Sequence, residues 1–305
     1  MSKTKKPITE FSVPALLQIV GEHYKEYGVV FDSDDICIAR NKQTGLGGRH
    51  PLNEPIRLRA NHLLFFKSGR ATYVCNLMKT NIVSGTVLAM SDSTIYTIKD
   101  FSPDCRFDVV VFSTSVLQNA AGKIPFNIFN GKRKSYSFIA SETDSHLLEK
   151  CFDTLVEVCQ SSTSKEHTRI LALQMLVGMT DNVLTGIGTE NHSREQSNAE
   201  RIFSSFLSLV NKDFRKHRDL AYYADKLCIS VNHLSTTVSV FSGIPPKQWI
   251  EQAIITEAKV QLRYDQQTVT QISDELNFSS PSHFCRYFRR IVGQTPKKYA
   301  MIENV

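Results

Sequence analysis

Five basic side chains gather near the carboxyl end of the chain, where no acidic residue accompanies them. Residues 277–300 contain neither Asp nor Glu, and their basic residues are Arg286, Arg289, Arg290, Lys297 and Lys298. The whole chain of 305 residues has a formal net charge of only +6, so this charge is local. A concentrated basic patch is typical of a site for a polyanion such as nucleic acid. A solvated helix face would carry the same charge, and charge alone does not decide between the two.

The spacing of these residues favours nucleic acid. At 100° per residue, Phe288 and Ile291 would lie within about 40° of Phe284, on one face of a helix. The opposite face, roughly 140–240° away, is formed by Ser282, Arg286, Arg289 and Arg290. A helix with an apolar back and an arginine front fits the major groove, where Arg286 can hold O6 and N7 of a guanine. Side chains toward the helix end and beyond are better placed for phosphates. They are Arg289, Arg290, Lys297 and Lys298, with Lys247 at the position that matches Lys297 in the repeat described next.

The basic helix belongs to the second copy of an internal repeat. The first copy runs from Ala224 to Trp249 and the second from Ser273 to Tyr299. Matching positions are 49 residues apart up to Ser279 and 50 apart afterwards, which places one extra residue near Pro281. Both copies are therefore expected to fold alike. Trp249 and Tyr299 occupy matching sites and are interpreted as core anchors.

Each copy has the pattern of a helix-turn-helix. A short helix is followed by a three-residue turn and by a serine whose side-chain oxygen can cap the next helix. The capping serine is Ser230 in the first copy and either Ser279 or Ser280 in the second. Each second helix carries apolar residues at i, i+4 and i+7. A glycine suited to a left-handed C-cap then follows, Gly243 or Gly293.

The second helix of the first copy offers different chemistry, because it carries no Lys or Arg. Its front is formed by Asn232, Thr236, Ser239 and Val240, with His233 and Ser235 at the margins. Asn232 can pair with adenine, and the methyl group of Thr236 can meet a thymine methyl. Thr and Val are also mediocre helix formers. We therefore expect this first reading helix to contribute less affinity than the second.

A proline-initiated amphipathic segment joins the two copies. It follows Pro245-Pro246, and proline is well tolerated at a helix start. About 18 residues of helix would give a rod of roughly 27 Å. Two reading helices on such a rod could lie about one DNA turn apart, roughly 34 Å. One chain could then read two adjacent major grooves without dimerising.

At these residues the sequence resembles the AraC/XylS family of bacterial transcription regulators, over about 218–300. The most specific part runs from Ile272 to Arg290 and is followed by Gly293, Thr295-Pro296 and Tyr299. The resemblance implies that positions used for base contacts are occupied by Asn232, Ser235, Thr236, Ser282 and Arg286. Family members usually carry an arginine or lysine in the first reading helix, where this chain has Thr236 and Ser239. The departure concerns DNA contacts of that helix and not its fold.

Residues 30–113 have the pattern of a β-domain. Segments rich in β-branched and aromatic residues, separated by turn residues, predict strands over 57–66, 70–77, 86–90, 93–98 and 106–113. Many short strands at close spacing predict a small sandwich or barrel. The region is loosely similar to the cupin-type sensor domain of the same family, which implies a small-molecule effector. The glycine-rich segment 45–48 follows no strand-to-helix pattern, so a phosphate-binding loop is not expected there.

Helical spacing begins at Ser141, which is a candidate N-cap together with Thr143. Apolar residues recur at helical intervals over 147–159 and within a second helix predicted over 166–184. These helices could pack on the β-domain or against a second subunit, and the pattern fits both. The polar, glycine-bearing segment Thr185–Asn198 has the composition of a linker, and the main domain boundary is expected there.

The predicted architecture is multidomain α+β. Residues 1–140 form a cupin-like β-barrel or sandwich that senses an effector, and residues 141–198 form a helical dimerisation segment and linker. Residues 199–305 form an all-α DNA-binding domain with two helix-turn-helix units joined by a linker helix. The expected partners are double-stranded DNA, a small effector, a second copy bound through residues 144–184, and RNA polymerase.

Composition excludes several other classes. Hydrophobic residues make up 41% and charged residues 22%, which excludes a disordered or collagen-like chain. No apolar run approaches the roughly 18 residues that span a bilayer, and no apolar signal core follows the basic start of the chain. The seven cysteines are odd in number and show no Cys-x-x-Cys spacing, as expected for reduced thiols. A soluble, cytoplasmic protein is therefore expected.

Two rival functions explain the sequence less well than DNA binding. A metal-dependent cupin enzyme needs clustered His and carboxylate ligands, and the β-region has His50 and His62 but no His-x-His pair. A protein-interaction adaptor built on the helices of 141–184 leaves the repeat unexplained. The expectation is therefore a DNA-binding transcription regulator with no catalytic residue, metal or cofactor.

Overall fold

The computed structural model describes residues 28–43, 52–58, 60–92, 94–118, 126, 128–129, 135–191, 197–263 and 267–301. The glycine-rich segment 45–48, His50 and the basic residues at the start of the chain lie outside these ranges. Internal contacts divide the chain into two units, with the boundary in the sequence between residues 193 and 194. Each unit is described by itself.

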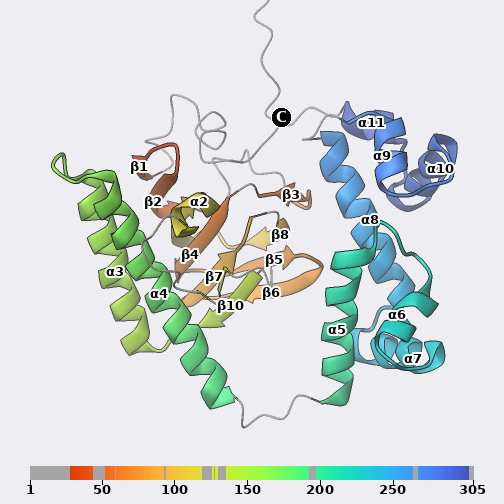
Figure 1. Cartoon of the computed structure of the whole chain (residues 1–305), viewed down its shortest axis with the longest axis horizontal. Coiled ribbons are helices and arrows are strands. Elements are labelled where there is room, and N and C mark those ends of the chain that lie inside the picture. The colour runs from red at the N-terminus through yellow and green to blue at the C-terminus, as the bar shows by residue number, and fades with distance from the viewer. Residues whose placement is uncertain are drawn as a thin grey trace, which may run out of the picture. The chain divides into compact units, whose positions relative to one another are not determined.

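The amino-terminal unit contains two antiparallel sheets (Figure 1). The larger sheet has the strand order β1-β2-β9-β4-β7-β10. Its strands are β1 (Val29–Asp32), β2 (Ile36–Gln43), β4 (Asn61–Ser68), β7 (Thr86–Met90), β9 (Arg106–Phe112) and β10 (Ser135–Ile139). The smaller sheet has the order β3-β8-β5-β6. Its strands are β3 (Ile56–Arg57), β5 (Ala71–Cys75), β6 (Met78–Ile82) and β8 (Ile95–Phe101).

The larger sheet is buried on both faces, which explains its nearly continuous apolar strands. In β7 every residue is buried: Val87 and Ala89 face one core, Leu88 and Met90 the other. The first core lies between the sheet and the helices α3 (Glu142–Gln160) and α4 (Glu166–Asn191). The second lies between the two sheets. The predicted β-sandwich with helices is confirmed.

One predicted strand was wrong, and four strands were not predicted individually: β1, β2, β6 and β10. The strand predicted over 57–66 is two strands, since Ile56–Arg57 pairs with β8 in the smaller sheet while Asn61–Ser68 pairs with β9 and β7 in the larger one. Strand β6 was missed because its turn, Asn76-Leu77, lacks glycine although both residues have positive φ. The edge strand β10 was missed as well; it pairs only with β7.

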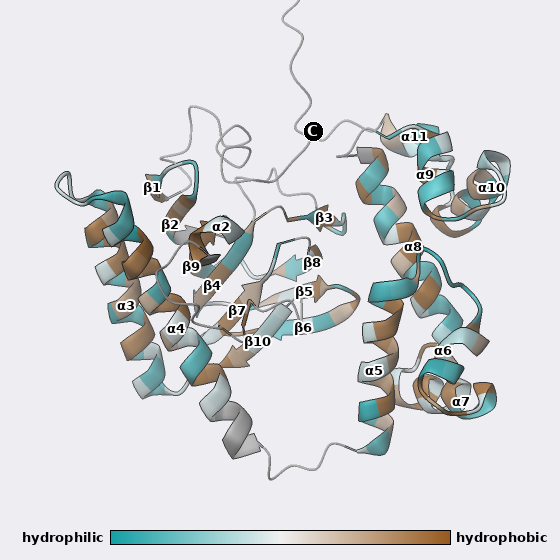
Figure 2. Cartoon of the chain, viewed as in Figure 1, coloured by the Kyte–Doolittle hydropathy of each residue, from teal (hydrophilic) through white to brown (hydrophobic). Residues whose placement is uncertain are grey.

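The helices of this unit begin as predicted but extend further. Ser141 is the N-cap of α3, and its side chain accepts a hydrogen bond from the amide of Asp144. Helix α4 continues to Asn191, so residues 185–191 are helical where a linker was expected. A short helix, α2 (Thr114–Gln118), follows β9. Figure 2 shows hydrophobic and hydrophilic residues alternating around α3, as expected for a helix with one buried face.

The carboxyl-terminal unit is helical throughout its described residues, as predicted. Its helices are α5 (Asn198–Asp213), α6 (Leu220–Lys226), α7 (Val231–Ser242), α8 (Pro246–Arg263), α9 (Val269–Glu275), α10 (Pro281–Val292) and α11 (Pro296–Ala300). Each reading helix, α7 and α10, buries two residues completely: Leu234 and Val238, or Phe284 and Phe288. None of the helices in the described part of the chain is long and apolar enough to cross a membrane.

Candidate nucleic-acid interface

The two helix-turn-helix units have matching backbone geometry. The turn residues Cys228 and Asn277, 49 positions apart, have φ of 54° and 55°. Both reading helices end at a left-handed glycine, Gly243 with φ 71° and Gly293 with φ 83°. Because only glycine adopts this conformation without strain, the glycines fix where each reading helix stops. The predicted repeat is thus a structural repeat.

The caps of the reading helices settle an alternative that the sequence left open. Ser230 caps α7, and Ser280 caps α10 by accepting a hydrogen bond from the amide of His283 at 3.2 Å. The Ser279 hydroxyl lies 3.0 Å from Nδ1 of His283 instead. Ser230 and Ser280 are 50 positions apart, so the extra residue of the second copy lies in the turn, before the cap and not after it.

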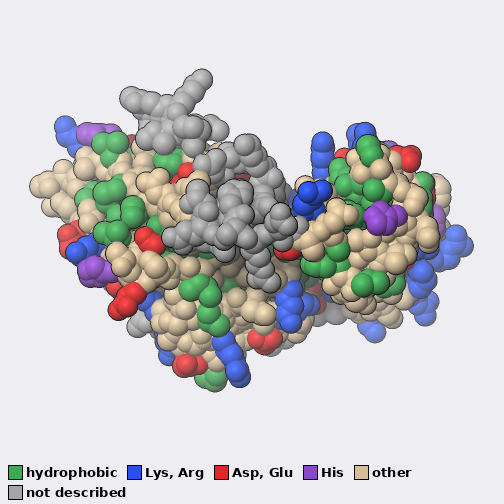
Figure 3. Space-filling model, turned by 90° about the horizontal axis from the view of Figure 1, so that it is seen from below, with side chains coloured by type: hydrophobic (Ala, Val, Ile, Leu, Met, Phe, Trp, Pro, Cys, Tyr) green, Lys and Arg blue, Asp and Glu red, His purple; other side chains and the backbone are tan. Residues whose placement is uncertain are grey.

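The front of α10 is solvent-exposed and positively charged. Ser282, Arg286 and Arg289 are all exposed, whereas Phe284 and Phe288 on the other side are fully buried. The sequence predicts this two-sided helix, but Ile291, which was expected on the apolar face, is 38% exposed. Phe241, its counterpart in α7, is 45% exposed. Figure 3 shows Lys and Arg side chains projecting from the surface of the carboxyl-terminal unit.

Arg290 differs from its neighbours because it already has a partner. Its guanidinium forms an ion pair with Glu251 of α8 at 2.8 Å. It also lies 5.2 Å from the centroid of the Tyr287 ring. A phosphate contact by Arg290 would have to share or break the pair with Glu251. Sequence reasoning missed Glu251, since no pattern marks an acid on the linker helix as the partner of this arginine.

The front of α7 is exposed but uncharged. Asn232 and Thr236 are exposed and Ser235 is partly buried. Val240, which occupies the place of Arg290, is 80% exposed. No Lys or Arg occurs between 231 and 242, so the first reading helix can contact DNA only through neutral side chains.

The remaining basic residues lie at equivalent helix starts. Lys247 begins α8 just after Pro246, and Lys297 and Lys298 lie in α11 just after Pro296; all three lysines are exposed. Trp249 and Tyr299 anchor these helices. The indole Nε1 of Trp249 donates to the Ser242 hydroxyl at 3.1 Å, and the Tyr299 ring is buried against Phe288.

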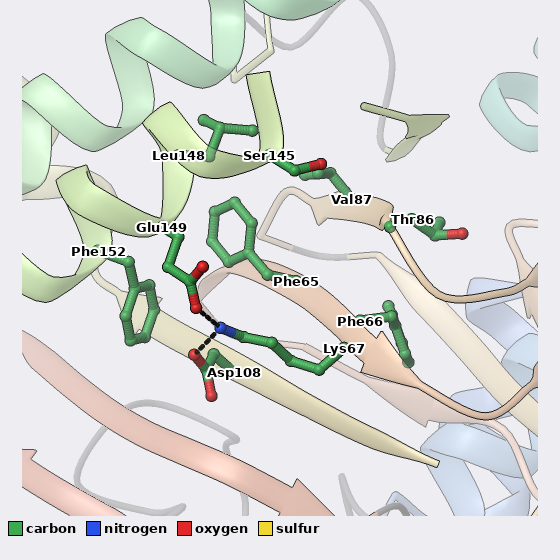
Figure 4. Close-up of a pocket in the computed structure, with 11 residues that line it drawn as sticks. Phe65, Phe66, Lys67, Thr86, Val87, Asp108, Ser145, Leu148, Glu149 and Phe152 are labelled. Atoms are coloured by element: carbon green, nitrogen blue, oxygen red, sulfur yellow. Dashed lines mark hydrogen bonds and ion pairs between the residues drawn. The ribbon is translucent and has the colours of Figure 1, made fainter. Parts of the chain in front are cut away.

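The amino-terminal unit has a small cavity of about 90 Å³ between the larger sheet and α3 (Figure 4). Phe65, Leu148 and Phe152 form apolar walls, and Lys67 reaches in to meet two carboxylates. Its Nζ lies 3.3 Å from Asp108 and forms a short ion pair with Glu149. Burial lowers the pKa of Lys67, but the hydrogen bonds and charges of Glu149 and Asp108 outweigh it and raise that pKa above its usual value.

Metal-ligand geometry does not occur in the part of the chain that the structure describes. No group of three His, Cys, Asp or Glu side chains there could hold a metal ion. His62 is buried, and its Nδ1 lies 3.1 Å from the carbonyl oxygen of Ala60. The rival prediction of a metal-dependent enzyme thus gains no support from His62.

The carboxyl-terminal unit matches a known family of domains. A family model described as a helix-turn-helix domain matches residues 223–301, the two modules built above. Residues 223–301 of this chain therefore form a helix-turn-helix domain. Among relatives, the transcriptional activator RhaS of Escherichia fergusonii is 22% identical over 160 residues, which are 51% of this chain and about half (55%) of that relative. RhaS of Pectobacterium carotovorum is 19% identical over 239 residues, 77% of this chain and 83% of the relative.

Structural similarity to solved proteins is distant. An apo form of ToxT from Vibrio cholerae has 12% sequence identity and a TM-score of 0.36, and the match covers 88% of this chain and 97% of ToxT. The similarity to known proteins therefore depends on the helix-turn-helix domain and the sequence relatives, and RhaS is described as a transcriptional activator.

Proposed function

We propose that this chain is an AraC/XylS-type transcription regulator that binds one face of a DNA duplex through α7 and α10, which enter two successive major grooves. The observation that carries the proposal is the exposed arginine face of α10. Arg286 and Arg289 are exposed while Phe284 and Phe288 hold the helix to the core. An arginine held in this way can form two hydrogen bonds to guanine. Such a protein works where the chromosome lies, and we place it in the bacterial cytoplasm.

Base contacts are assigned to exposed or half-exposed polar side chains on both helices. In α7 they are Asn232, Ser235 and Thr236, and in α10 they are Ser282 and Arg286. Phosphate contacts are assigned to Lys247, Arg289, Lys297 and Lys298, and to Arg290 when it leaves Glu251. Because α7 is uncharged, α10 supplies most of the affinity and α7 mainly discriminates between sequences.

A pair of substitutions tests this division. Arg286→Ala is expected to weaken binding to a selected duplex by about 1–3 kcal/mol, or about 5- to 150-fold, because a bidentate base contact is lost. Asn232→Ala should cost less. Both are measured by DNA titration at one fixed salt concentration, since affinity depends strongly on salt. A larger loss for Asn232→Ala than for Arg286→Ala would reject the ranking.

The amino-terminal unit is proposed to bind a small effector that alters DNA affinity. The cavity beside Lys67 is the proposed site, because it combines apolar walls with polar groups at one end, as small-molecule sites do. Its volume of about 90 Å³ is below the roughly 300–1,000 Å³ of ordinary ligand sites, so an effector must widen it. A ligand screen by thermal stability and DNA affinity tests the idea. A ligand that binds here should shift both readouts, and its effect should be lost in Phe152→Ala. A broad screen in which nothing changed either readout would count against effector control.

Dimerisation through α3 and α4 is the second proposed interaction of this unit. Leu171 and Met175 are one helical turn apart on α4 and are 58% and 44% exposed, and Leu147 of α3 is 40% exposed. Apolar side chains left in solvent at this spacing are typical of an interface. RNA polymerase is the further partner that a regulator bound beside a promoter would contact. Analytical ultracentrifugation of Leu171→Glu against the unchanged chain would detect loss of a dimer.

A further inference from the structure

The segment between α5 and α6 touches both the linker helix and the second helix-turn-helix. We refer to residues 214–219 as the bridge segment. From it, the Arg218 guanidinium donates a hydrogen bond to the carbonyl oxygen of Leu276 and lies 3.6 Å from the centroid of the Phe278 ring. In return, Nδ2 of Asn277 donates to the carbonyl oxygen of Lys216 at 3.4 Å. The bridge segment thus holds the turn of the second module from outside that module.

These contacts continue directly to the second reading helix. Phe278 is 6% exposed, and its ring centroid lies 5.2 Å from those of Phe284 and Tyr287, both in α10. Arg218 therefore stacks on Phe278, and α10 packs against the same ring. The same bridge segment leads directly into α6, the first helix of the first module, which packs on α7.

A second contact ties the bridge segment to the linker helix. Arg215 pairs with Glu257 of α8 at 2.8 Å, and Glu257 is only 1% exposed. Gln261 connects that carboxylate to Glu275 of α9, with distances of 3.2 and 2.7 Å from its Nε2. The linker helix is thus held by polar contacts to elements on both sides of it.

The internal repeat shows that this arrangement is not a general part of the motif. The position that matches Arg218, 49 residues later, is Gln267. Gln267 donates to Glu275 at 2.7 Å, within its own module. Of these two matching residues, Arg218 contacts the other module and Gln267 does not. The Arg218 contact is therefore not part of the repeat and joins one module to the other.

We propose that Arg218, assisted by Arg215, is a positioning residue that fixes the register between α7 and α10, so that the chain accepts a single spacing between its two DNA half-sites. The inference rests on the proposed two-groove binding. One added base pair moves the next half-site by roughly 3.4 Å and turns it by about 35°. If the linker helix were the sole connection between the modules, it could bend to follow this change. The contact of Arg218 with the second module is an additional connection that prevents such bending.

The test uses the full-length chain and a duplex obtained by in vitro selection with it. Variants of that duplex add or remove one and two base pairs between the half-sites, and one carries a scrambled first half-site. The proteins compared are the unchanged chain, Arg218→Ala, Arg218→Lys and Arg201→Ala. Arg201 is an exposed arginine of α5 and serves as the matched control. Thermal melting of each variant reports its folding.

For the unchanged chain and Arg201→Ala, a one-base-pair change should lower affinity at least about 10-fold, as loss of several base contacts would. For Arg218→Ala the same change should cost less than about 3-fold, with Arg218→Lys in between, because lysine keeps the charge but not the planar stacking. The inference would be overturned if Arg218→Ala lost affinity equally on every duplex. It would also be overturned if the dependence of affinity on spacing were the same for Arg218→Ala and the unchanged chain. If scrambling the first half-site had no effect on the unchanged chain, the two-groove proposal itself would fail.

Discussion

Arg289 and Arg290 are adjacent in the sequence but differ in their surroundings. Both are exposed residues of α10, and both were assigned to phosphates from their position on the helix. Arg290 is paired with Glu251, an interaction that must be given up or shared before a phosphate can be bound. For Arg289 no such competing contact is found in the described residues. Arg289 is therefore the stronger candidate for a phosphate contact, although both residues are exposed arginines.

This difference predicts unequal salt dependence. Each phosphate contact contributes about −0.9 to the slope of log K against log salt. Arg289→Ala should therefore make the slope shallower by about 0.9, whereas Arg290→Ala should change it by clearly less. DNA titrations at several salt concentrations measure both. Equal changes in the two variants would show that Glu251 does not hold Arg290 back.

At the level of elements, helix α3 is attached to the larger sheet by charge as well as by its apolar face. Lys67 of β4 binds Glu149, and Arg40 of β2 pairs with Asp153 at 2.7 Å. Asp108 of β9 lies between the two cations, 3.3 Å from Lys67 and 3.6 Å from Arg40. These pairs come from three neighbouring strands and set where α3 lies over the sheet, next to the cavity of Figure 4.

The hydrogen bond and charge of Lys67 lower the pKa of Glu149, which makes this attachment pH-dependent. A carboxylate with a depressed pKa stabilises the fold above its ordinary pKa of 4.5, and that contribution is lost as the pH falls through its folded value. Glu149→Gln should lower the free energy of unfolding at pH 7 by less than about 1 kcal/mol, because a half-exposed pair is screened by solvent. The difference from the unchanged chain should narrow below pH 4.5.

Urea denaturation at several pH values measures this effect. Glu157→Gln is the control, since it removes another exposed carboxylate from the same helix. A Glu149→Gln effect that stayed constant across the pH range, or that Glu157→Gln reproduced, would contradict the prediction.

At the scale of the whole molecule, each unit has its own apolar core. The amino-terminal unit buries two clusters on either side of its larger sheet. The carboxyl-terminal unit buries Phe206, Tyr223, Leu234, Phe284 and Phe288 among others. Because each unit buries apolar residues of its own, the carboxyl-terminal unit should not need the amino-terminal unit in order to fold.

A fragment of residues 194–305 should therefore select the same DNA sequence as the full chain. Any difference should lie in affinity or in the response to an effector, because the proposed base contacts all lie on α7 and α10. In vitro selection with both proteins compares them directly, and circular dichroism reports whether the fragment is helical. A folded fragment that selected a different sequence would show that the amino-terminal unit takes part in reading DNA.

The sequence by itself determined the helix-turn-helix modules, because their signals are local. Apolar spacing, a capping serine and a C-cap glycine all act within a dozen residues. They correctly placed Phe284 and Phe288 in the core and Arg286 on the surface, although Ile291 of the same predicted face is exposed. The strand pairing and the contacts between modules depended on residues that are distant in the chain. Two contacts join residues about 40 to 60 positions apart: the Arg290–Glu251 pair and the contact of Arg218 with Leu276. The segment 57–66 is split between two sheets because its two halves pair with strands about as far away in the chain. Only the packed tertiary structure decides these contacts, because a partner that far away leaves no periodic trace in the local sequence.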